Sequence, residues 1–461
     1  MNKGTSQNLN YKKNTYISTK ILLQSSAFIL INMLIYFYIL YLYDFQPNVV
    51  TLLFLLLTPL LVHPVIVTKD IMNPFSIFIM SSQSLFIYNM IDVNANKTAL
   101  RYGSVHPEYF NISFAYSVLI IIIWYIVAYS GYNYADRFKT SNFLTKFNFT
   151  LDNPKLIAIG IFLISILSFI YTAADKGGIS GMILSSQNRV EEFSGQAYLI
   201  KLVLLGTISS LILLVHNYKK ISFIMIIITF FMLSLFGGRG AAFGGTILPF
   251  VICYHYRIRR IKIIELAFIG GIALLFIIYY GHYRLYQNFN IELESFTNII
   301  SNAAASTQSG DILPALVGSL RTGNIPYSKG RTLLNVFLAP IPRTLWAKKP
   351  IIDETGVIGK LMIGKDGWGL PPGTYGIAYF NFGIIGVITF GFITGIFVRQ
   401  VYKTLILKRE QTNESFGVVV YAILIGSVFN VFSTSAQINI IWYGVTFLLI
   451  KYIDKIKFRI K

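Results

Sequence analysis

Charge and cysteine are both scarce in this chain. Only 13% of its 461 residues are charged, whereas roughly a quarter of the residues carry charge in a soluble globular domain. This shortage excludes a soluble globular protein. The single cysteine, Cys253, excludes an intramolecular disulfide and any metal cluster built from cysteines.

Hydrophobic residues make up 54% of the chain, and the mean hydropathy is +0.61. Uncharged runs approach or exceed the ~20 residues that cross a bilayer core. They cover residues 21–43, 49–67, 74–91, 110–134, 156–174, 202–215, 221–236, 241–256, 263–281, 376–398, 416–431 and 437–450. Because the runs are continuous rather than alternating, they predict helices and not barrel strands. We therefore expect an all-α, polytopic integral membrane protein with about 12 transmembrane helices (11–13), folded as one bundle over residues 1–461.

Positive charge is in excess, with a net charge of +20. If the N-terminus lies inside, the inward segments hold 24 of the 39 basic residues and a net charge of +17, against +3 outside. The positive-inside rule then places both termini in the cytoplasm. Membrane topology thus accounts for most of the excess positive charge. A nucleic-acid partner is not expected, because nucleic-acid-binding proteins carry their basic residues on a charge-rich soluble surface.

One connection is far longer than the others. Residues 282–375 form an extracytoplasmic loop of about 94 residues with two moderately apolar pieces, 312–320 and 333–341, expected to be short helices lying on the bundle. Loops of this length are usually functional. Nine cations lie on this loop, on the side where the positive-inside rule disfavours them: Arg284, Arg321, Lys329, Arg331, Arg343, Lys348, Lys349, Lys360 and Lys365.

An arginine interrupts the glycine-rich sequence FGGRGAAFGG at residues 236–245. The helices on either side are slightly short for a bilayer, which places Arg239 near the outer interface at the tip of a helical hairpin. A turn with one snorkelling cation is the alternative. The start of the following helix also attracts anions, so we favour an anion site.

Two further segments surround the end of the long loop. In LAPIPRTLWAKKP, residues 338–350, two prolines preclude a regular helix around Arg343, and anchoring at the interface by Trp346 and lysines is the alternative to a functional role. The stretch GWGLPPGTYGIAYFNFGIIG, residues 367–386, predicts a re-entrant or irregular segment buried against protein, with a flexible linker as the alternative.

Together these segments resemble the Wzy-type oligosaccharide repeat-unit polymerases, which build O-antigen and capsular polysaccharide. The resemblance covers about residues 175–386 and rests on Gly-Arg-Gly together with the Pro-Arg-x-x-Trp-x-x-Lys-Pro spacing. Ala347 departs from the family, which often has proline there. The resemblance implies a glycosyltransferase without metal or cofactor, on the outer face of the bacterial cytoplasmic membrane. Its substrates are undecaprenyl-diphosphate-linked oligosaccharides in the lipid bilayer, and a polysaccharide chain-length regulator is a candidate partner.

The resemblance also suggests roles for particular residues. Arg239 and Arg343 are the expected diphosphate ligands in catalysis. Arg284, Arg331 and Lys349 support them, and Arg189 is a candidate for binding the second lipid-linked substrate. His282 is a candidate catalytic base, although a lone histidine at a membrane surface is more often an interfacial residue. The other outward candidates for this proton acceptor stay open: Glu292, Glu294, Asp311, Asp353, Glu354 and Asp366.

Three other functions compete with polymerisation. A lipid-linked oligosaccharide ligase needs the same diphosphate chemistry. A flippase or transporter needs charged residues inside several helices, whereas the helix interiors here are nearly free of charge. A non-catalytic scaffold leaves the outward cations unexplained.

Substitution of Arg239 or Arg343 by alanine should leave the protein inserted but abolish long polymer, because the leaving diphosphate loses a cation that stabilises its growing charge. The measurement is polymer length on a gel at matched expression. Full-length chains from either variant would show that the diphosphate role is wrong.

Overall fold

The structure is a computed structural model. It describes residues 53, 56–57, 70–79, 90, 107–147, 149–186, 192–193, 196–237, 242–262, 264–266, 268–272, 275–276, 310–341, 345–346, 348–364, 369–407 and 416–455. Within these ranges every element is helical. The expected spans 21–43, 49–67 and 263–281 lie wholly or largely outside the described residues.

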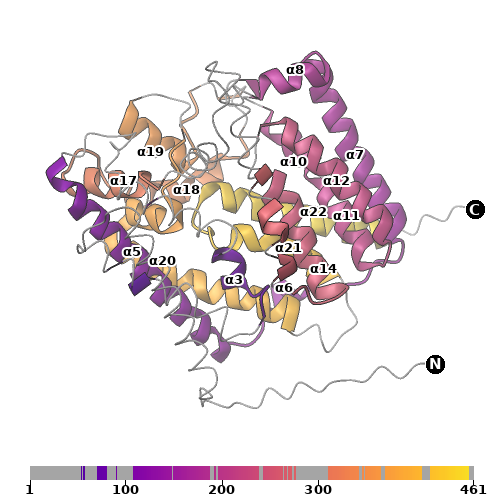
Figure 1. Cartoon of the computed structure of the whole chain (residues 1–461), viewed down its shortest axis with the longest axis horizontal. Coiled ribbons are helices and arrows are strands. Elements are labelled where there is room, and N and C mark those ends of the chain that lie inside the picture. The colour runs from indigo at the N-terminus through magenta and orange to yellow at the C-terminus, as the bar shows by residue number, and fades with distance from the viewer. Residues whose placement is uncertain are drawn as a thin grey trace, which may run out of the picture.

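The helices alternate between long membrane-length elements and short connecting ones (Figure 1). The first half of the chain contains α3 (Pro74–Phe78), α5 (Pro107–Tyr134), η2 (Ala135–Arg137), α6 (Asn142–Thr145), α7 (Pro154–Asp175), α8 (Gly178–Ser185), α10 (Ala197–Val203), α11 (Leu205–Val215) and α12 (Lys219–Leu235). The second half contains η3 (Phe243–Ile247), α14 (Leu248–Arg257), α17 (Ile312–Arg321), α18 (Arg331–Leu338), α19 (Glu354–Ile363), α20 (Gly373–Tyr402), η4 (Lys403–Leu407), α21 (Phe416–Val428) and α22 (Thr434–Lys455).

Five stretches of helix are long and apolar enough to cross a membrane: Ile112–Arg137, Pro154–Asp175, Ala197–Val215, Gly373–Leu407 and Thr434–Lys455. Each overlaps a span expected from the sequence. On α7 the side chains of Leu163, Leu167 and Ile170 are exposed, as lipid contact requires. The helices therefore indicate a membrane protein, while the count of twelve spans stays a prediction.

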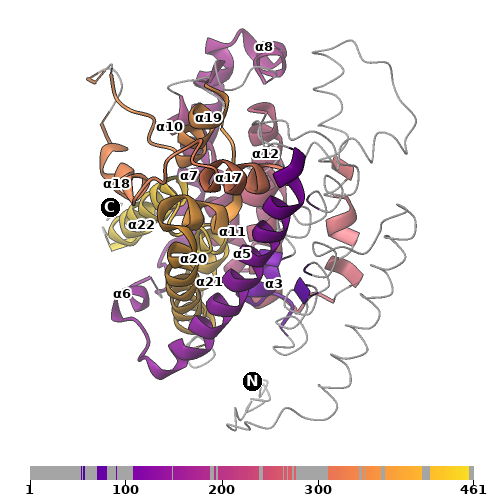
Figure 2. The ribbon, with the colours of Figure 1, turned by 90° about the vertical axis from the view of Figure 1, so that its left-hand side faces the viewer.

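Several of the short helices lie toward two ends of the bundle (Figure 2). We call the end with α8, α17, α18 and α19 the α19 end, and the end with η2 and α6 the α6 end. At the α6 end, Arg399 Nε donates to Asp136 Oδ1 at 2.8 Å, and the Asp454 carboxylate accepts the Asp152 amide at 2.9 Å. Lys451 Nζ donates to the carbonyl of Lys146 at 2.9 Å. These contacts join segments that the sequence assigns to one side of the membrane.

The closest helix pair is α5 with α20, which lie side by side in both views (Figures 1 and 2). Glycines make this contact possible, because a Cβ on Gly131 would overlap the Phe392 carbonyl and a Cβ on Gly395 would overlap the Ala128 carbonyl. Backbone therefore touches backbone, as is common where membrane helices meet through small residues. This contact fixes the position of α20.

A partly buried carboxylate, Asp70, connects the segment before α3 to α14 and α20. The hydroxyls of Tyr402 and Tyr256 donate to Asp70 at 2.6 and 2.8 Å, the Met72 amide donates at 3.0 Å, and His255 Nε2 lies 3.4 Å away. Burial alone would raise the pKa of Asp70, but the hydrogen bonds from His255, Tyr402, Tyr256 and the Met72 amide lower it overall. Asp70 is thus held as a carboxylate in an otherwise apolar region.

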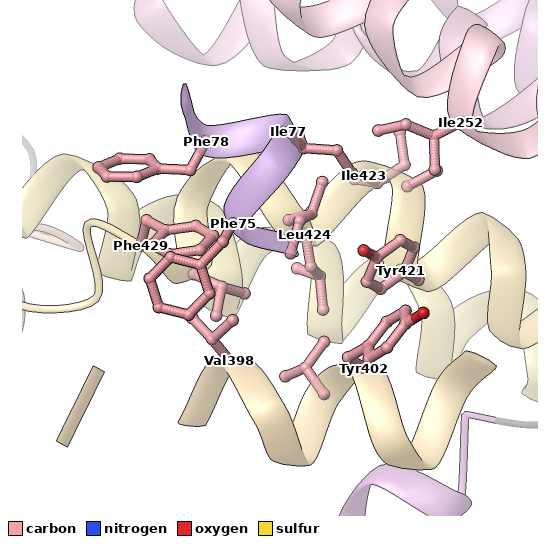
Figure 3. Packing of buried hydrophobic residues seen from close by; sticks show 14 of the residues in the cluster. Phe75, Ile77, Phe78, Ile252, Val398, Tyr402, Tyr421, Ile423, Leu424 and Phe429 are labelled. Carbon is pink, nitrogen blue, oxygen red and sulfur yellow. The ribbon is translucent and has the colours of Figure 1, made fainter. Parts of the chain in front are cut away.

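Aromatic rings of α3 pack beside this cluster (Figure 3). Phe78 stacks on Phe429 with centroids 4.2 Å apart, and Phe75 meets Phe429 edge to face at 5.3 Å. The Tyr421 hydroxyl donates to the Met72 carbonyl at 3.0 Å. The segment around α3 is therefore part of the bundle core.

We expect Gly395→Leu to destabilise the protein by about 2 kcal/mol or more, because a side chain there forces α5 away from α20. The measurement is the thermal midpoint and the monodisperse fraction in detergent. Gly444→Leu is the matched control, since a Cβ at Gly444 in α22 has no neighbour within 4 Å. Equal behaviour of the two variants would contradict the packing argument.

Candidate functional site at the α19 end

The first helix of the long loop, α17, is inserted into the protein. All of its residues from Ile312 to Leu320 are buried, and it packs against α5, α19 and α20. The sequence predicted this helix but placed it on the surface of the bundle, and that placement is wrong. A helix that is apolar on all sides is favoured inside, where every face meets protein.

The second helix, α18, turns its polar face inward. The Thr332 hydroxyl donates to Asn381 Oδ1 at 2.8 Å, and Asn335 Nδ2 donates to the Ile352 carbonyl at 3.0 Å. On the opposite face Leu334 is 64% exposed and Phe337 is 75% exposed. Such an inverted amphipathic helix suits contact with lipid rather than with water.

Lys349 makes hydrogen bonds within the segment that follows α18. Its buried ammonium donates to the carbonyls of Ile341 at 2.7 Å and Ala339 at 3.2 Å. Lysine near a helix C-terminus satisfies carbonyls that lack helical partners. The structure therefore gives Lys349 a contact within the loop, and its supporting role toward diphosphate stays a prediction.

The exposed apolar surface continues past α18. Leu345 and Trp346 both lie exposed in the segment that carries the predicted Arg343. Together with Leu334 and Phe337 they form what we call the apolar loop surface. Tryptophan and leucine in such a position are typical of a membrane interface.

Glu354, the first residue of α19, is only 1% exposed. Its carboxylate accepts hydrogen bonds from the Ser433 hydroxyl and, at 2.9 Å, from the Thr434 amide at the start of α22. Burial raises the pKa of Glu354, and the hydrogen bond from Ser433 opposes the rise. The position is favourable because free amides at a helix N-terminus attract negative charge.

The Glu354 carboxylate belongs to a network of hydrogen bonds that joins three helices. The Thr434 hydroxyl donates to the Thr332 carbonyl at 3.0 Å, and Ser433 Oγ lies 2.8 Å from Ser435 Oγ. The network connects α18, α19 and α22. Glu354, one of the open candidates for the proton acceptor, is thus engaged in holding the loop on the bundle.

Helix α20 is broken at two residues near this end. Phe382 (φ −140°, ψ 22°) and Gly383 (φ 60°, ψ −145°) leave the helical conformation, and the angles of Gly383 are available essentially to glycine alone. The Ser328 amide donates to the Phe380 carbonyl at 2.9 Å, which satisfies a group freed by the break. From Gly373 onward the expected irregular stretch is therefore a broken helix, buried from Tyr375 to Asn381 and exposed at the break, and not a flexible linker.

Two cations stand at the start of α18. Lys329 and Arg331 are both exposed, and within the described part of the chain neither side chain makes a hydrogen bond or ion pair. The guanidinium of Arg321, by contrast, lies 3.6 Å from the ring centroid of Tyr116. Arg331, a predicted supporting ligand, is thus available for an anion.

The remaining predicted site residues lie outside the described residues: Arg189, Arg239, His282, Arg284 and Arg343. The chain on either side of Arg189, Arg239 and Arg343 is described, and for the first two the flanking segments are in contact. A Cβ on Gly237 would come within 2.7 Å of the Ser186 carbonyl, and Phe236 and Ala242 share a core cluster with Met182 and Val203. The segments that lead to Arg189 and Arg239 therefore meet.

A lysine that the sequence analysis left unassigned lies inside a span. Lys201 belongs to the stretch Ala197–Val215, and its ammonium donates to Asn439 of α22. The expected helix began at residue 202, immediately after this charge. A charge adjoining an apolar run was the available signal, because ionisable groups inside membranes are often functional.

Comparisons of the chain with protein families, curated proteins and solved structures find no match. Across the described ranges, no three His, Cys, Asp or Glu side chains gather to hold a metal ion. The arrangement of the α19 end itself is the guide to function. Cations beside exposed apolar surface suit a ligand with an anionic head and an apolar tail.

Replacement of Glu354 by glutamine should change how stability depends on pH. Because the native pKa of Glu354 is raised above 4.5, the native state binds this proton more tightly than the unfolded state does. The stabilisation from this proton is complete below about pH 4 and is lost as the pH rises through the raised native pKa.

We therefore expect the thermal midpoint of Glu354→Gln to increase relative to that of the unchanged protein as the pH rises from about 4 to 7. Glu354→Ala is the control, because it also lacks the titrating group and should shift with pH in the same direction, with a further loss of about 1–3 kcal/mol from the missing hydrogen-bond acceptors. A constant difference between the glutamine variant and the parent would contradict the raised pKa.

Proposed function

We propose that this protein is a polymerase that joins undecaprenyl-diphosphate-linked oligosaccharide repeat units into a polysaccharide of the O-antigen or capsule kind. The observation that carries the proposal is the inverted helix α18, which exposes Leu334 and Phe337 and begins at Arg331, whose side chain has no partner among the described residues. A loop of this kind suits a substrate held in the membrane with its phosphates at the surface.

The charge of the substrate matches the cations of the loop. A lipid diphosphate is bound best by arginine and lysine at interfacial depth, because arginine forms paired hydrogen bonds with phosphate oxygens. Arg331 and Lys329 lie at the α19 end, and the described neighbours of Arg189 and Arg239 pack at the same end. The exposed Lys329 and Arg331 support one anionic headgroup region at this end.

The reaction needs little more than positioning and charge stabilisation. A sugar hydroxyl of the incoming repeat unit attacks the anomeric carbon of the growing chain, and the bond from that carbon to the diphosphate oxygen breaks. The lipid diphosphate leaves with the bonding electron pair, and the hydroxyl proton passes to a base. Fixed cations near the leaving oxygen would lower the barrier, because negative charge grows there in the transition state.

The proposal also assigns a direction in the membrane. The α19 end faces outward from the bacterial cytoplasmic membrane, and the α6 end and both termini face the cytoplasm. Support comes from the charge count, since the basic segments that meet at the α6 end are those that the positive-inside rule retains.

Purified protein in detergent, supplied with one defined undecaprenyl-diphosphate repeat unit, tests the proposal. We expect a ladder of products spaced by one repeat. Arg331→Ala should slow the ladder about tenfold, the equivalent of one charge-assisted hydrogen bond.

Arg260→Ala is the matched control, because Arg260 is an exposed arginine beyond α14 and outside the proposed site. A single product that forms only with a second acceptor would indicate a ligase instead. No product at all, with the lipid moved across vesicles, would indicate a flippase.

A further inference from the structure

A groove opens at the break in α20. It has a volume of about 470 Å³ and is lined by Tyr327, Lys329, Asn381, Phe382, Gly383, Ile385, Thr389 and Phe390. Most of this lining is apolar, and Ile385 on the membrane-spanning part of α20 is 67% exposed. The groove therefore lies where the loop meets the surface of a span.

The break creates the groove, and the loop before α18 forms its wall. A Cβ on Gly330 would come within 2.7 Å of the Phe382 ring, and a Cβ on Gly383 would lie 3.7 Å from the Tyr327 ring. Behind the groove, Phe390 stacks on Phe432 with centroids 3.9 Å apart. The aromatic walls are thus fixed by contacts on both sides.

Two polar side chains at the groove, Asn381 and Lys329, differ in their hydrogen bonding. The Asn381 amide is occupied, since its Oδ1 accepts from Thr332 and its Nδ2 donates to the Ile377 carbonyl at 2.9 Å. Lys329 has no such partner within the described ranges, and Arg331 stands two residues further along. An occupant would therefore meet an apolar channel with two available cations beside it.

We infer that this groove holds the first isoprene units of a polyprenyl diphosphate, with Lys329 and Arg331 at the diphosphate. The inference rests on the proposed function and adds the place where the lipid part of the substrate is bound. Two cations two residues apart in the chain, one of them in the groove lining, fit a diphosphate better than the single phosphate of a membrane phospholipid, and the apolar walls fit the isoprene chain. A lipid can enter from the bilayer, because the exposed Ile385 belongs to a membrane-spanning stretch.

Direct binding tests the inference without any need for polymer. The full-length protein in detergent is titrated with radiolabelled undecaprenyl diphosphate, and Kd is compared among variants. Ile385→Trp fills the groove and Lys329→Glu reverses its charge, so each should weaken binding at least about tenfold.

Two controls match these variants. Ile393→Trp changes an isoleucine that is 48% exposed on α20 but does not line the groove, and Lys455→Glu reverses an exposed cation at the end of α22. Both should bind as the parent does. Lys329→Glu is a surface change, so it keeps the test decisive if the tryptophan variant fails to give a monodisperse protein.

Three outcomes would overturn the inference. The first is unchanged binding by a monodisperse Ile385→Trp or by Lys329→Glu. The second is displacement of the probe by an equal concentration of dioleoylphosphatidylglycerol, which would indicate a general phospholipid contact. The third is binding of inorganic diphosphate to the parent protein as tightly as undecaprenyl diphosphate, which would show that the isoprene chain contributes no affinity.

The failure of this inference can be told apart from failure of the proposed function. A normal ladder from Ile385→Trp would agree with the proposed polymerase activity and show that the groove does not bind its substrate. The opposite result is a parent protein that makes no ladder but binds undecaprenyl diphosphate more tightly than Ile385→Trp does. It would support the lipid site and contradict the polymerase activity.

Discussion

The contact between α5 and α20 determines where the other parts of the α19 end can lie. Gly131 and Gly395 bring the two backbones together, and no larger residue fits at either position. Since lipid offers helices no hydrophobic reason to associate, close packing of this kind is what holds a membrane bundle together. With α20 fixed along α5, its break at Phe382 and Gly383 is fixed too, and α17 fills the space beside the same two helices.

Buried polar groups add connections that apolar packing alone cannot specify. Asp70 connects the segment before α3 to α14 and α20, and Glu354 connects α19 to the start of α22. Leaving either carboxylate without its partners would be costly, because an unpaired charge in an apolar interior loses its hydration. Each network therefore commits several helices to one arrangement, one near the C-terminal end of α20 and the other at the α19 end.

Four of the described cations show two contrasting kinds of surroundings. Arg399 and Arg259 are paired with Asp136 and Glu265, as expected for structural charges. Lys329 lines the groove and Arg331 begins the helix with the exposed apolar face, and neither has an acidic partner in the described ranges. An anionic amphiphile would supply both the missing charge and the missing apolar contact, which is why the same region supports the proposed function and the inferred lipid site.

The sequence by itself determined where membrane-length helices form. Length and apolarity are local properties, so the spans around 110–134, 156–174 and 376–398 and the short helix at 312–320 follow from the residues themselves. It also drew attention to the loop cations, Arg331 among them, because nine cations on a loop expected to face outward depart from the positive-inside rule.

Only the tertiary structure decided how these pieces face one another. α17 is buried because α5, α19 and α20 surround it, and the inversion of α18 depends on hydrogen bonds from Thr332 to Asn381 and from Asn335 to Ile352. The Glu354 contact with Thr434 spans 80 residues, and the groove needs the turn before α18 to lie over the break in α20. Hydrogen bonds and close packing across such distances are set by the three-dimensional arrangement of helices, and no local pattern of residues encodes them.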